Sequence, residues 1–306
     1  RLYRDRSMVA ATLQRSLLPP ELPHVPGIDL GARYVAAGDG IEVGGDFYDV
    51  FQTGAKEWAI VMGDVCGKGV DAAALTGLAR STLRATAMQT RKPARILKSL
   101  NKVLMATEMG DRFCTLNYVR LRKLGDELLL TVCSAGHPLP MILTDLGEVH
   151  GVGEPGTLLG QFEDTTLSEQ IIRLAPGDSL VLFTDGVIEA RGTEGELEEG
   201  GLRELLRSLR GSSATKLATK IERKALDIQK GKPHDDIAVL VIKAQRLGAE
   251  TDYLDQHDGP ARSIDLTGPG QEVMSSQSAP QIVSFSLPVD EQAASNARHV
   301  LRAKLR

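Results

Sequence analysis

The chain has 306 residues, of which 42% are hydrophobic and 25% are charged, values typical of a globular protein with room for one large domain or two ordinary ones. Its net charge of −4 excludes the basic surface that nucleic-acid binding requires, and no apolar run approaches the length of about 18 residues that a membrane span needs. Cys66, Cys114 and Cys133 form no Cys-x-x-Cys pair, which argues against disulfides or a structural zinc site and predicts a reducing, cytoplasmic location.

Residues 1–18 predict a helix, because Val9, Leu13 and Leu17 recur at helical spacing and a pair of prolines ends the pattern. This helix either packs on the core of the following domain, or arrives from a sensor domain upstream and pairs with its copy in a homodimer. The first residue is Arg1 and not methionine, so we expect a piece of a longer protein. No signal-peptide pattern is present at its start.

Two strands joined by a glycine-rich turn are predicted within residues 28–50. The turn places Asp46 and Asp49 beside two glycines, which allow backbone and ions to approach an acid closely. Glycine–aspartate pairs also occupy ordinary turns. The motif alone therefore fits either an acid that ions can approach or a plain turn.

The apolar run over residues 58–62 predicts a buried strand that delivers Asp64 into a glycine-rich turn. Asp71 then fits the N-cap of a helix predicted over residues 72–89. A carboxylate at the end of a buried strand has a rigid support, which suits a metal ligand or a catalytic acid. The alternative is a plain strand-to-helix connection in which Asp64 only caps a neighbouring group.

A second helix is predicted over residues 94–106, where apolar residues recur at helical spacing. Strands follow over residues 113–121 and 127–133, and the second ends in a turn over residues 134–140. His137 in that turn acts as a proton donor or a ligand, or simply satisfies the turn.

Residues 147–160 are rich in glycine and predict a loop. After it, a second apolar strand delivers Asp185 into a glycine turn, for which the alternative is an ordinary Asp-Gly hairpin.

Residues 194–201 are acidic and glycine-rich and predict a solvated loop, followed by a helix over residues 214–229. The strand predicted over residues 237–242 is then preceded by Asp235 and Asp236. This is the third apolar strand with an acid at one end, and here the acids precede the strand.

Beyond Lys243 the composition changes. Residues 245–281 are rich in Gly, Pro, Ser and Gln and predict a linker. Residues 282–288 predict a strand, and residues 291–305 predict a helix capped by Asp290. This terminal segment is too short to fold alone, so we expect it to be the first strand and helix of a further domain.

Acids stand where an apolar run meets a glycine or a turn at Asp46, Asp64, Asp185 and Asp235 or Asp236. If they converge, their mutual repulsion calls for hard divalent cations, whose preferred ligands are oxygens. Two such ions can clamp a phosphoryl group. Phosphate monoester hydrolysis needs up to about 10²¹-fold acceleration, whereas one general acid or base supplies about 10²–10⁴-fold.

Taken together, five motifs resemble the PPM (protein phosphatase 2C-like) family of metal-dependent serine/threonine phosphatases, and in particular its bacterial stress-response and sporulation branch. The resemblance extends over about residues 12–243. The motifs are Gly44-Gly-Asp-Phe-Tyr-Asp49, Gly63-Asp-Val-Cys-Gly-Lys-Gly69, Ser134-Ala-Gly-His-Pro138, Phe183-Thr-Asp-Gly-Val187 and Asp235-Asp-Ile237.

The resemblance implies an α+β fold, a four-layer α-β-β-α sandwich of two antiparallel sheets flanked by helices. It also implies two Mn²⁺ or Mg²⁺ ions at one end. Asp64 would bridge both ions, and the backbone carbonyl of Val65 and the side chain of Asp46 would bind the second. Asp185 and Asp235 would hold the first.

The family's ligand is the first acid of its final pair, so Asp235 is preferred over Asp236, and both remain in the expected ligand set. Asp46, Asp64 and Asp185 are also the expected catalytic acids. In the family, a water activated by both ions attacks phosphorus and the serine or threonine alkoxide leaves.

The branch acts on a phosphorylated anti-sigma-factor antagonist, which makes phosphoserine or phosphothreonine of such a protein the expected substrate, in the regulation of an alternative sigma factor. Two alternatives are a catalytically weak phosphatase fold that docks antagonist or kinase partners, and a hydrolase of small phosphoesters.

Residues 285–298 resemble the opening of an anti-sigma kinase of the histidine-kinase-like ATPase type. The expected organisation is therefore a linker helix from a sensor domain (1–20), a phosphatase domain (21–244), a flexible linker (245–281) and the start of a kinase domain in the same chain (282–306).

The sequence departs from the family in two respects. Cys66 stands where some members have the histidine that protonates the leaving group, which leaves His137, His234 or a metal-bound water for that role. The phosphate-binding arginine of eukaryotic members has no clear match, and Arg33 and Lys68 are the replacements considered.

Overall fold

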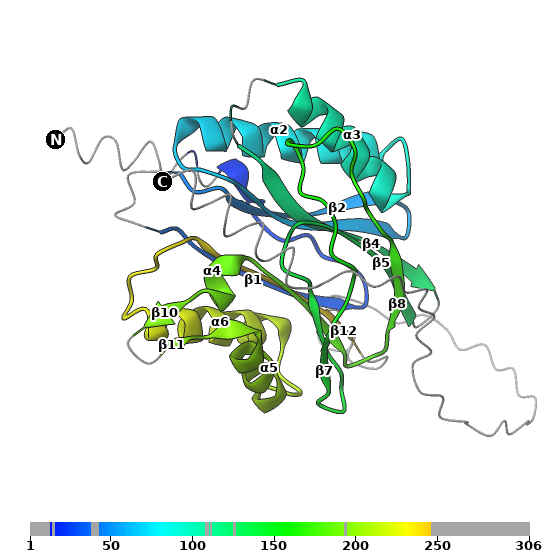
Figure 1. The fold of residues 1–306 in the computed structure, drawn as a ribbon. Coiled ribbons are helices and arrows are strands. Elements are labelled where there is room, and N and C mark those ends of the chain that lie inside the picture. The colour runs from blue at the N-terminus through cyan, green and yellow to red at the C-terminus, as the bar shows by residue number, and fades with distance from the viewer. Residues whose placement is uncertain are drawn as a thin grey trace, which may run out of the picture.

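The computed structural model describes Leu13 and residues 16–37, 43–107, 110, 112–124, 127–192 and 195–245. These residues form two five-stranded antiparallel sheets stacked face to face, with helices on the outer side of each sheet (Figure 1). The predicted α+β class and the four-layer α-β-β-α arrangement are confirmed.

The first sheet carries the Asp46 and Asp64 motifs and consists of four consecutive strands with β8 at its edge. Its strands lie in the order β2-β3-β4-β5-β8. They are β2 (Asp46–Gly54), β3 (Glu57–Val65), β4 (Cys114–Leu124), β5 (Glu127–Ala135) and β8 (Gln170–Leu174). Helices α2 (Val70–Ala87) and α3 (Pro93–Met105) cover its outer face.

The second sheet brings together strands from both ends of the described chain, in the order β1-β12-β9-β6-β7. They are β1 (Ile28–Val35), β12 (Ile237–Ala244), β9 (Ser179–Phe183), β6 (Met141–Leu143) and β7 (Val149–Gly151). Its outer face packs on α5 (Glu198–Ser208) and α6 (Ala214–Ile228). The remaining elements are α4 (Asp185–Ile188), β10 (Arg191–Gly192) and β11 (Gly195–Glu196).

Side-chain alternation along each strand decides which layer a residue joins. On β3, Ile60 and Met62 face the second sheet and pack in one core with Leu240 of β12. Phe47 and Val61 point the other way, into the core beneath α2 and α3. The two faces of the first sheet are therefore both buried, against the other sheet and against helices.

The strand registers bring the acid-bearing segments to one end of the sandwich. Asp46 at the start of β2 lies opposite Asp64 near the end of β3. In the second sheet Phe183 at the end of β9 lies opposite Val239, close to the start of β12. Because β2 and β12 contact each other across the sheets, these ends are neighbours in space.

Most of the strands and helices predicted from periodicity are present, with ends shifted by a few residues. One predicted cap is wrong: the N-cap of α2 is Gly69, and Asp71 lies in the first turn of the helix, where its side chain pairs with Arg112. Glycine occupies the cap because its φ of 89° is unfavourable for a residue with a side chain.

Two predicted loops are also corrected. Residues 147–160 contain β7, which pairs with β6, and residues 194–201 contain the start of α5, not only a solvated loop. Asp185 does not belong to an Asp-Gly hairpin, because it begins the short helix α4.

Several predictions fall mainly outside the described residues. Of the helix predicted over residues 1–18, the structure describes Leu13, Ser16 and Leu17, which are helical, and Leu18, which is in a bend. Leu17 packs against Ala73 of α2. The predicted linker beyond Gln245 and the terminal strand and helix lie outside the described part. Within that part, no helix combines the length and apolar character needed to cross a membrane.

Candidate metal centre

Asp46 and Asp64 face each other at the end of the β2–β3 pair. Both side chains have the strand parity of Tyr48 and Met62, which pack in the core between the sheets. Only 3% of Asp46 and 8% of Asp64 is exposed. Two buried carboxylates this close disfavour each other's charged form.

The second sheet contributes two more buried acids. Asp185 follows β9 and Asp236 precedes β12, and they are 8% and 4% exposed. Burial raises the pKa of Asp46 well above its ordinary value, and the charges of Asp64, Asp236 and Asp185, in that order, raise it further. The structure therefore brings together four acids that are far apart in the sequence.

The Asp46 carboxylate has one side-chain partner, and one of its oxygens has none among the described residues. The Thr184 side chain forms a hydrogen bond with the carboxylate, and its Oγ1 also accepts the backbone N–H of Ala238 at 3.0 Å. The atom Asp46 Oδ2 is buried and has no hydrogen-bond partner among the residues that the structure describes. A buried acceptor is costly to leave unpaired, so a ligand that fills this position would be stabilised.

A hard divalent cation fits this position chemically. The converging side chains are carboxylates, and oxygen ligands are those that Mg²⁺ and Mn²⁺ prefer. In the described part of the chain, no three His, Cys, Asp or Glu side chains are already arranged as a complete ligand set. The acids thus lie close together but do not form a complete set of metal ligands, and the individual ligand assignments remain predictions.

Gly44 and Gly45 leave the space that the acids occupy. A Cβ atom on Gly44 would lie 1.6 Å from Asp236 Oδ2, and one on Gly45 would lie 2.0 Å from the Val65 carbonyl oxygen. The same Cβ on Gly45 would lie 2.6 Å from Asp64 Oδ1. The glycines next to Asp46 are therefore required by close approach of the two acid-bearing segments, as the sequence predicted.

The final acid pair divides between two environments. Asp236 Oδ1 accepts the backbone N–H of Ala37 at 2.7 Å. Burial raises the pKa of Asp236, and the neighbouring charge of Asp235 adds to this, whereas the Ala37 hydrogen bond and the charge of Lys68 lower it. Asp235 is half-buried, and its Oδ1 accepts the N–H of Asp236 at 2.9 Å. The preference for Asp235 as the ligand stays a prediction, since it is the charge of Asp236 that acts on Asp46.

Asp49, the second acid of its motif, serves another purpose. Its strand position points it away from Asp46, toward α2, where it forms ion pairs with Arg80 at 3.2 Å and Arg84 at 2.8 Å. Arg84 also lies over the ring of Phe51 at 4.7 Å. Asp49 therefore anchors α2 on the first sheet.

The two histidines considered as proton donors have defined partners. His137 is buried, and its Nδ1 bonds to Thr115 Oγ1 at 2.9 Å, on the strand position paired with Asp64. His234 bonds through Nδ1 to Gln229 Oε1 at 2.9 Å, at the end of α6. His137 is thus linked by the Thr115 side chain to the position on β4 that lies opposite Asp64.

Cys66, at the position where some family members have histidine, packs with apolar neighbours in a small cluster.

Of the two basic residues considered for phosphate binding, Arg33 pairs with Glu222 at 3.4 Å. Lys68 is exposed and close enough to Asp236 to lower its pKa. The structure therefore favours Lys68 as the cation beside the acids.

Sequence reasoning missed Thr184 and Tyr34. Thr184 lies within the Phe-Thr-Asp-Gly motif that the sequence identified, but the sequence did not predict its hydrogen bond to Asp46. Tyr34 lies near Asp236 only because β1 pairs with β12, and no local pattern reports that pairing.

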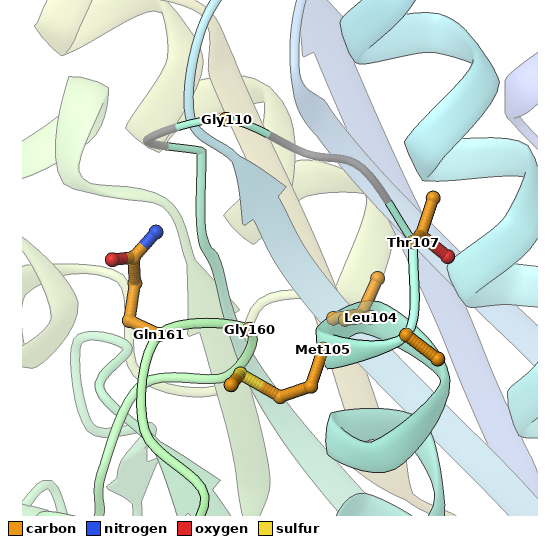
Figure 2. A pocket seen from close by; sticks show the side chains of 7 residues that line it. Leu104, Met105, Thr107, Gly110, Gly160 and Gln161 are labelled. Atoms are coloured by element: carbon orange, nitrogen blue, oxygen red, sulfur yellow. The ribbon is translucent and has the colours of Figure 1, made fainter.

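A cavity of about 420 Å³ lies at the C-terminal end of α3 (Figure 2). It is lined by Leu104, Met105, Ala106, Thr107, Gly110, Gly160 and Gln161. None of these described side chains is ionisable, in contrast to the acid cluster.

Comparison with known proteins gives consistent results. The family described as Stage II sporulation protein E (SpoIIE) matches residues 54–245. Phosphoserine phosphatase RsbU of Bacillus subtilis (strain 168) is 29% identical over 236 residues, which are 77% of this chain and 69% of RsbU.

Solved structures share the fold. The RsbU and RsbW domains of Rv1364c from Mycobacterium tuberculosis align with a TM-score of 0.63 and 25% identity, over 73% of this chain and 62% of that one. The SiaA-PP2C domain of Pseudomonas aeruginosa aligns with a TM-score of 0.63 and 22% identity, over 78% of this chain and 96% of that domain. The chain therefore spans less than two thirds of the Rv1364c structure.

Proposed function

The chain belongs to the Stage II sporulation protein E (SpoIIE) family, and from that premise we propose that it is a metal-dependent phosphatase that hydrolyses phosphoserine or phosphothreonine on an anti-sigma-factor antagonist. The observation that carries the proposal is the convergence of Asp46, Asp64, Asp185 and Asp236 in a buried site where one oxygen of Asp46 has no hydrogen-bond partner among the described residues. Its relative RsbU is named a phosphoserine phosphatase, which supports the reaction class.

In this proposal Asp46, Asp64, Asp185, the Val65 carbonyl and one or both acids of the final pair, Asp235 and Asp236, would hold two Mn²⁺ or Mg²⁺ ions. Such ions supply charge neutralisation for a phosphoryl group and activation of the attacking water.

The protein's own groups prepare the site. Thr184 forms a hydrogen bond with the Asp46 carboxylate, whose Oδ2 atom has no partner among the described residues, and the glycines before Asp46 allow Asp64 and Asp236 to approach. Lys68 is the exposed cation near Asp236 and attracts the phosphate dianion to an otherwise acidic surface.

The substrate and the partners are the finer part of the proposal. Family resemblance supports a phosphorylated antagonist, in the control of an alternative sigma factor. The Rv1364c structure, which contains RsbU and RsbW domains, supports a further domain after the phosphatase domain, in keeping with the proposed kinase-like segment from residue 282. A sensor domain before residue 20 remains part of the same proposal.

The test compares two isosteric substitutions. Asp64→Asn is expected to lower Mn²⁺-dependent phosphate release from a phosphoserine protein by at least about 100-fold, because metal stabilisation is worth several kcal/mol and each 1.36 kcal/mol is about tenfold in rate. Asp164→Asn alters an exposed acid outside the cluster and is expected to leave the rate unchanged.

Three outcomes discriminate between the candidate functions. Release that requires Mn²⁺ or Mg²⁺ and stops with EDTA supports the phosphatase. Ion binding without hydrolysis of any phosphoprotein would favour the docking module. Hydrolysis of a small aryl phosphate but not of a phosphoprotein would favour a small-molecule hydrolase.

A further inference from the structure

Tyr34 places a hydroxyl group at the inner side of the acid cluster. On β1 it lies opposite Ala238, two residues after Asp236, and its ring packs against the core between the sheets. Further along the chain, the Ala37 N–H donates to Asp236 Oδ1 at 2.7 Å. The segment from Tyr34 to Ala37 therefore runs along the Asp236 carboxylate.

The hydroxyl is unusual in its surroundings. The Tyr34 Oη atom is fully buried and has no well-aligned hydrogen-bond partner in the described part of the chain, although Asp236 is close enough to interact with it. Asp236, Asp46 and Asp64 act on Tyr34 electrostatically, and its hydroxyl group can donate a hydrogen bond to a carboxylate of this cluster.

Two buried orphan atoms thus border the same acids, the donor Tyr34 Oη and the acceptor Asp46 Oδ2. An unmade hydrogen bond at a buried atom is unfavourable, and both would be relieved by one event. A cation that engages Asp46 Oδ2 and draws the Asp236 carboxylate into a fixed orientation would complete the alignment with Tyr34.

We infer that Tyr34 is a positioning residue of the metal centre, whose hydroxyl donates to Asp236 and orients that carboxylate when divalent ions bind. The inference rests on the proposed metal dependence and adds a residue that acts through Asp236 without touching the substrate. Hydrogen bonds from outer residues to metal-ligating groups typically change metal affinity by about 10- to 100-fold.

Tyr48 provides a matched control. It is also a tyrosine packed on the core between the sheets, two residues along β2 from Asp46. Burial raises its pKa, but the ionised neighbours that act on it are Arg33 and Arg80 and not the acids. Removal of its hydroxyl therefore changes a similar environment without changing the donors to Asp236.

The experiment measures Mn²⁺ binding by calorimetry, without substrate, for the full chain and for the Tyr34→Phe and Tyr48→Phe variants. Tyr34→Phe is expected to raise the Kd for Mn²⁺ by about 10-fold or more, and Tyr48→Phe by less than about twofold. Thermal unfolding in EDTA should be the same for all three, and the rise in Tm on adding Mn²⁺ should be smaller for Tyr34→Phe only.

Each other outcome overturns the inference. An unchanged Kd in Tyr34→Phe, an equal loss in Tyr48→Phe, or unfolding of Tyr34→Phe in EDTA would assign the hydroxyl no role or a purely structural one, and absence of Mn²⁺ binding by the unaltered chain would remove the centre itself. Because binding is measured without turnover, a chain that binds Mn²⁺ through Tyr34 but hydrolyses nothing would refute the proposed function alone.

Discussion

Among single residues, Gly45 is closely confined by the backbone and side chains that carry the acid cluster. Gly45→Ala would place a Cβ atom 2.0 Å from the Val65 carbonyl oxygen and 2.6 Å from Asp64 Oδ1. The β2–β3 pair must then widen where it carries the acids, and overpacking of this kind costs about 1–3 kcal/mol. We expect urea unfolding in EDTA to show a loss of this size, together with weaker Mn²⁺ binding.

Gly200 is the control for that substitution. A Cβ on Gly200 in α5 would meet no atom within 4 Å, and alanine is favoured over glycine in helices by about 0.5–1 kcal/mol. Gly200→Ala should therefore be neutral or stabilising, with unchanged Mn²⁺ affinity. If Gly45→Ala behaved like Gly200→Ala, the close approach of β2 and β3 would not constrain the site.

Some site residues could be predicted from the local sequence pattern, and others could not. Asp46, Asp64 and Asp185 were predicted because each stands where a continuous apolar run meets a glycine or a turn, which is a local pattern. Thr184 and Tyr34 were not, because their contacts depend on which strands pair and in which register. Register is a long-range property that local periodicity does not determine.

At the scale of elements, Glu57 joins the hairpin β2–β3 to its surroundings. It pairs with Arg120 of β4 at 2.5 Å and with Arg91, in the α2–α3 connection. Burial alone would raise its pKa, but the hydrogen bonds and charges of Arg120 and Arg91 outweigh this and hold it below the ordinary value of 4.5. A lowered pKa means that the ionised form stabilises the fold.

Glu57→Gln should reveal that contribution through its pH dependence. Because the pKa is lowered on folding, the stabilisation is complete above the unfolded-state pKa and is lost as the pH falls through the folded-state value. We expect Glu57→Gln to be less stable than the unaltered chain by about 1–2 kcal/mol at neutral pH, and the difference to narrow below about pH 4. Urea unfolding at several pH values measures both.

Glu127→Gln is the corresponding exposed substitution. Glu127 is 56% exposed and pairs with Arg173, which is 71% exposed, at 3.6 Å. Exposed ion pairs contribute about 0–1 kcal/mol, so we expect little loss and little pH dependence. If the free energy of unfolding of the two variants depended on pH in the same way, Glu57 would contribute no more to stability than an exposed charge does.

Elements were predictable where their own sequence carries the burial pattern. In α3, Ile96, Leu97 and Leu100 lie at helical spacing on the buried face, and this helix was predicted. In α5, Gly200 and several acids suggested a loop, and the helix forms because Leu202 and its neighbours are buried against the second sheet. Strand β8 has one buried residue, Leu174, and is held by its pairing with β5, which no local pattern shows.

For the molecule as a whole, the acid cluster lies on the seam between the two sheets. One sheet supplies Asp46 and Asp64, and the other supplies Asp185 and Asp236 from strands β9 and β12. In the first of these sheets β2 to β5 are consecutive strands and β8 is added at the edge, whereas the second joins β1 to β12 across most of the described chain. Periodicity indicated that strands exist, but their division between two sheets followed only from the family resemblance.

Strand β12 is therefore the element that closes the domain. It lies between β1 and β9, and beyond it the Gln245 N–H donates to the Gly27 carbonyl at 3.0 Å. The family match also ends at residue 245. We predict that removal of residues 246–306 changes the Tm by less than about 3 °C, equivalent to about 1 kcal/mol for a domain of this size, and leaves Mn²⁺-dependent hydrolysis within about twofold.

A chain ending at Lys232 is the contrasting case. It would lack β12 and Asp236, so β1 and β9 would lose their common partner and the acid cluster one of its members. We expect no cooperative thermal transition by circular dichroism for this shorter chain. Were the chain ending at Gln245 to lose its cooperative transition as well, the segment beyond it would have to be part of the same folding unit, and the proposed boundary between phosphatase domain and linker would be wrong.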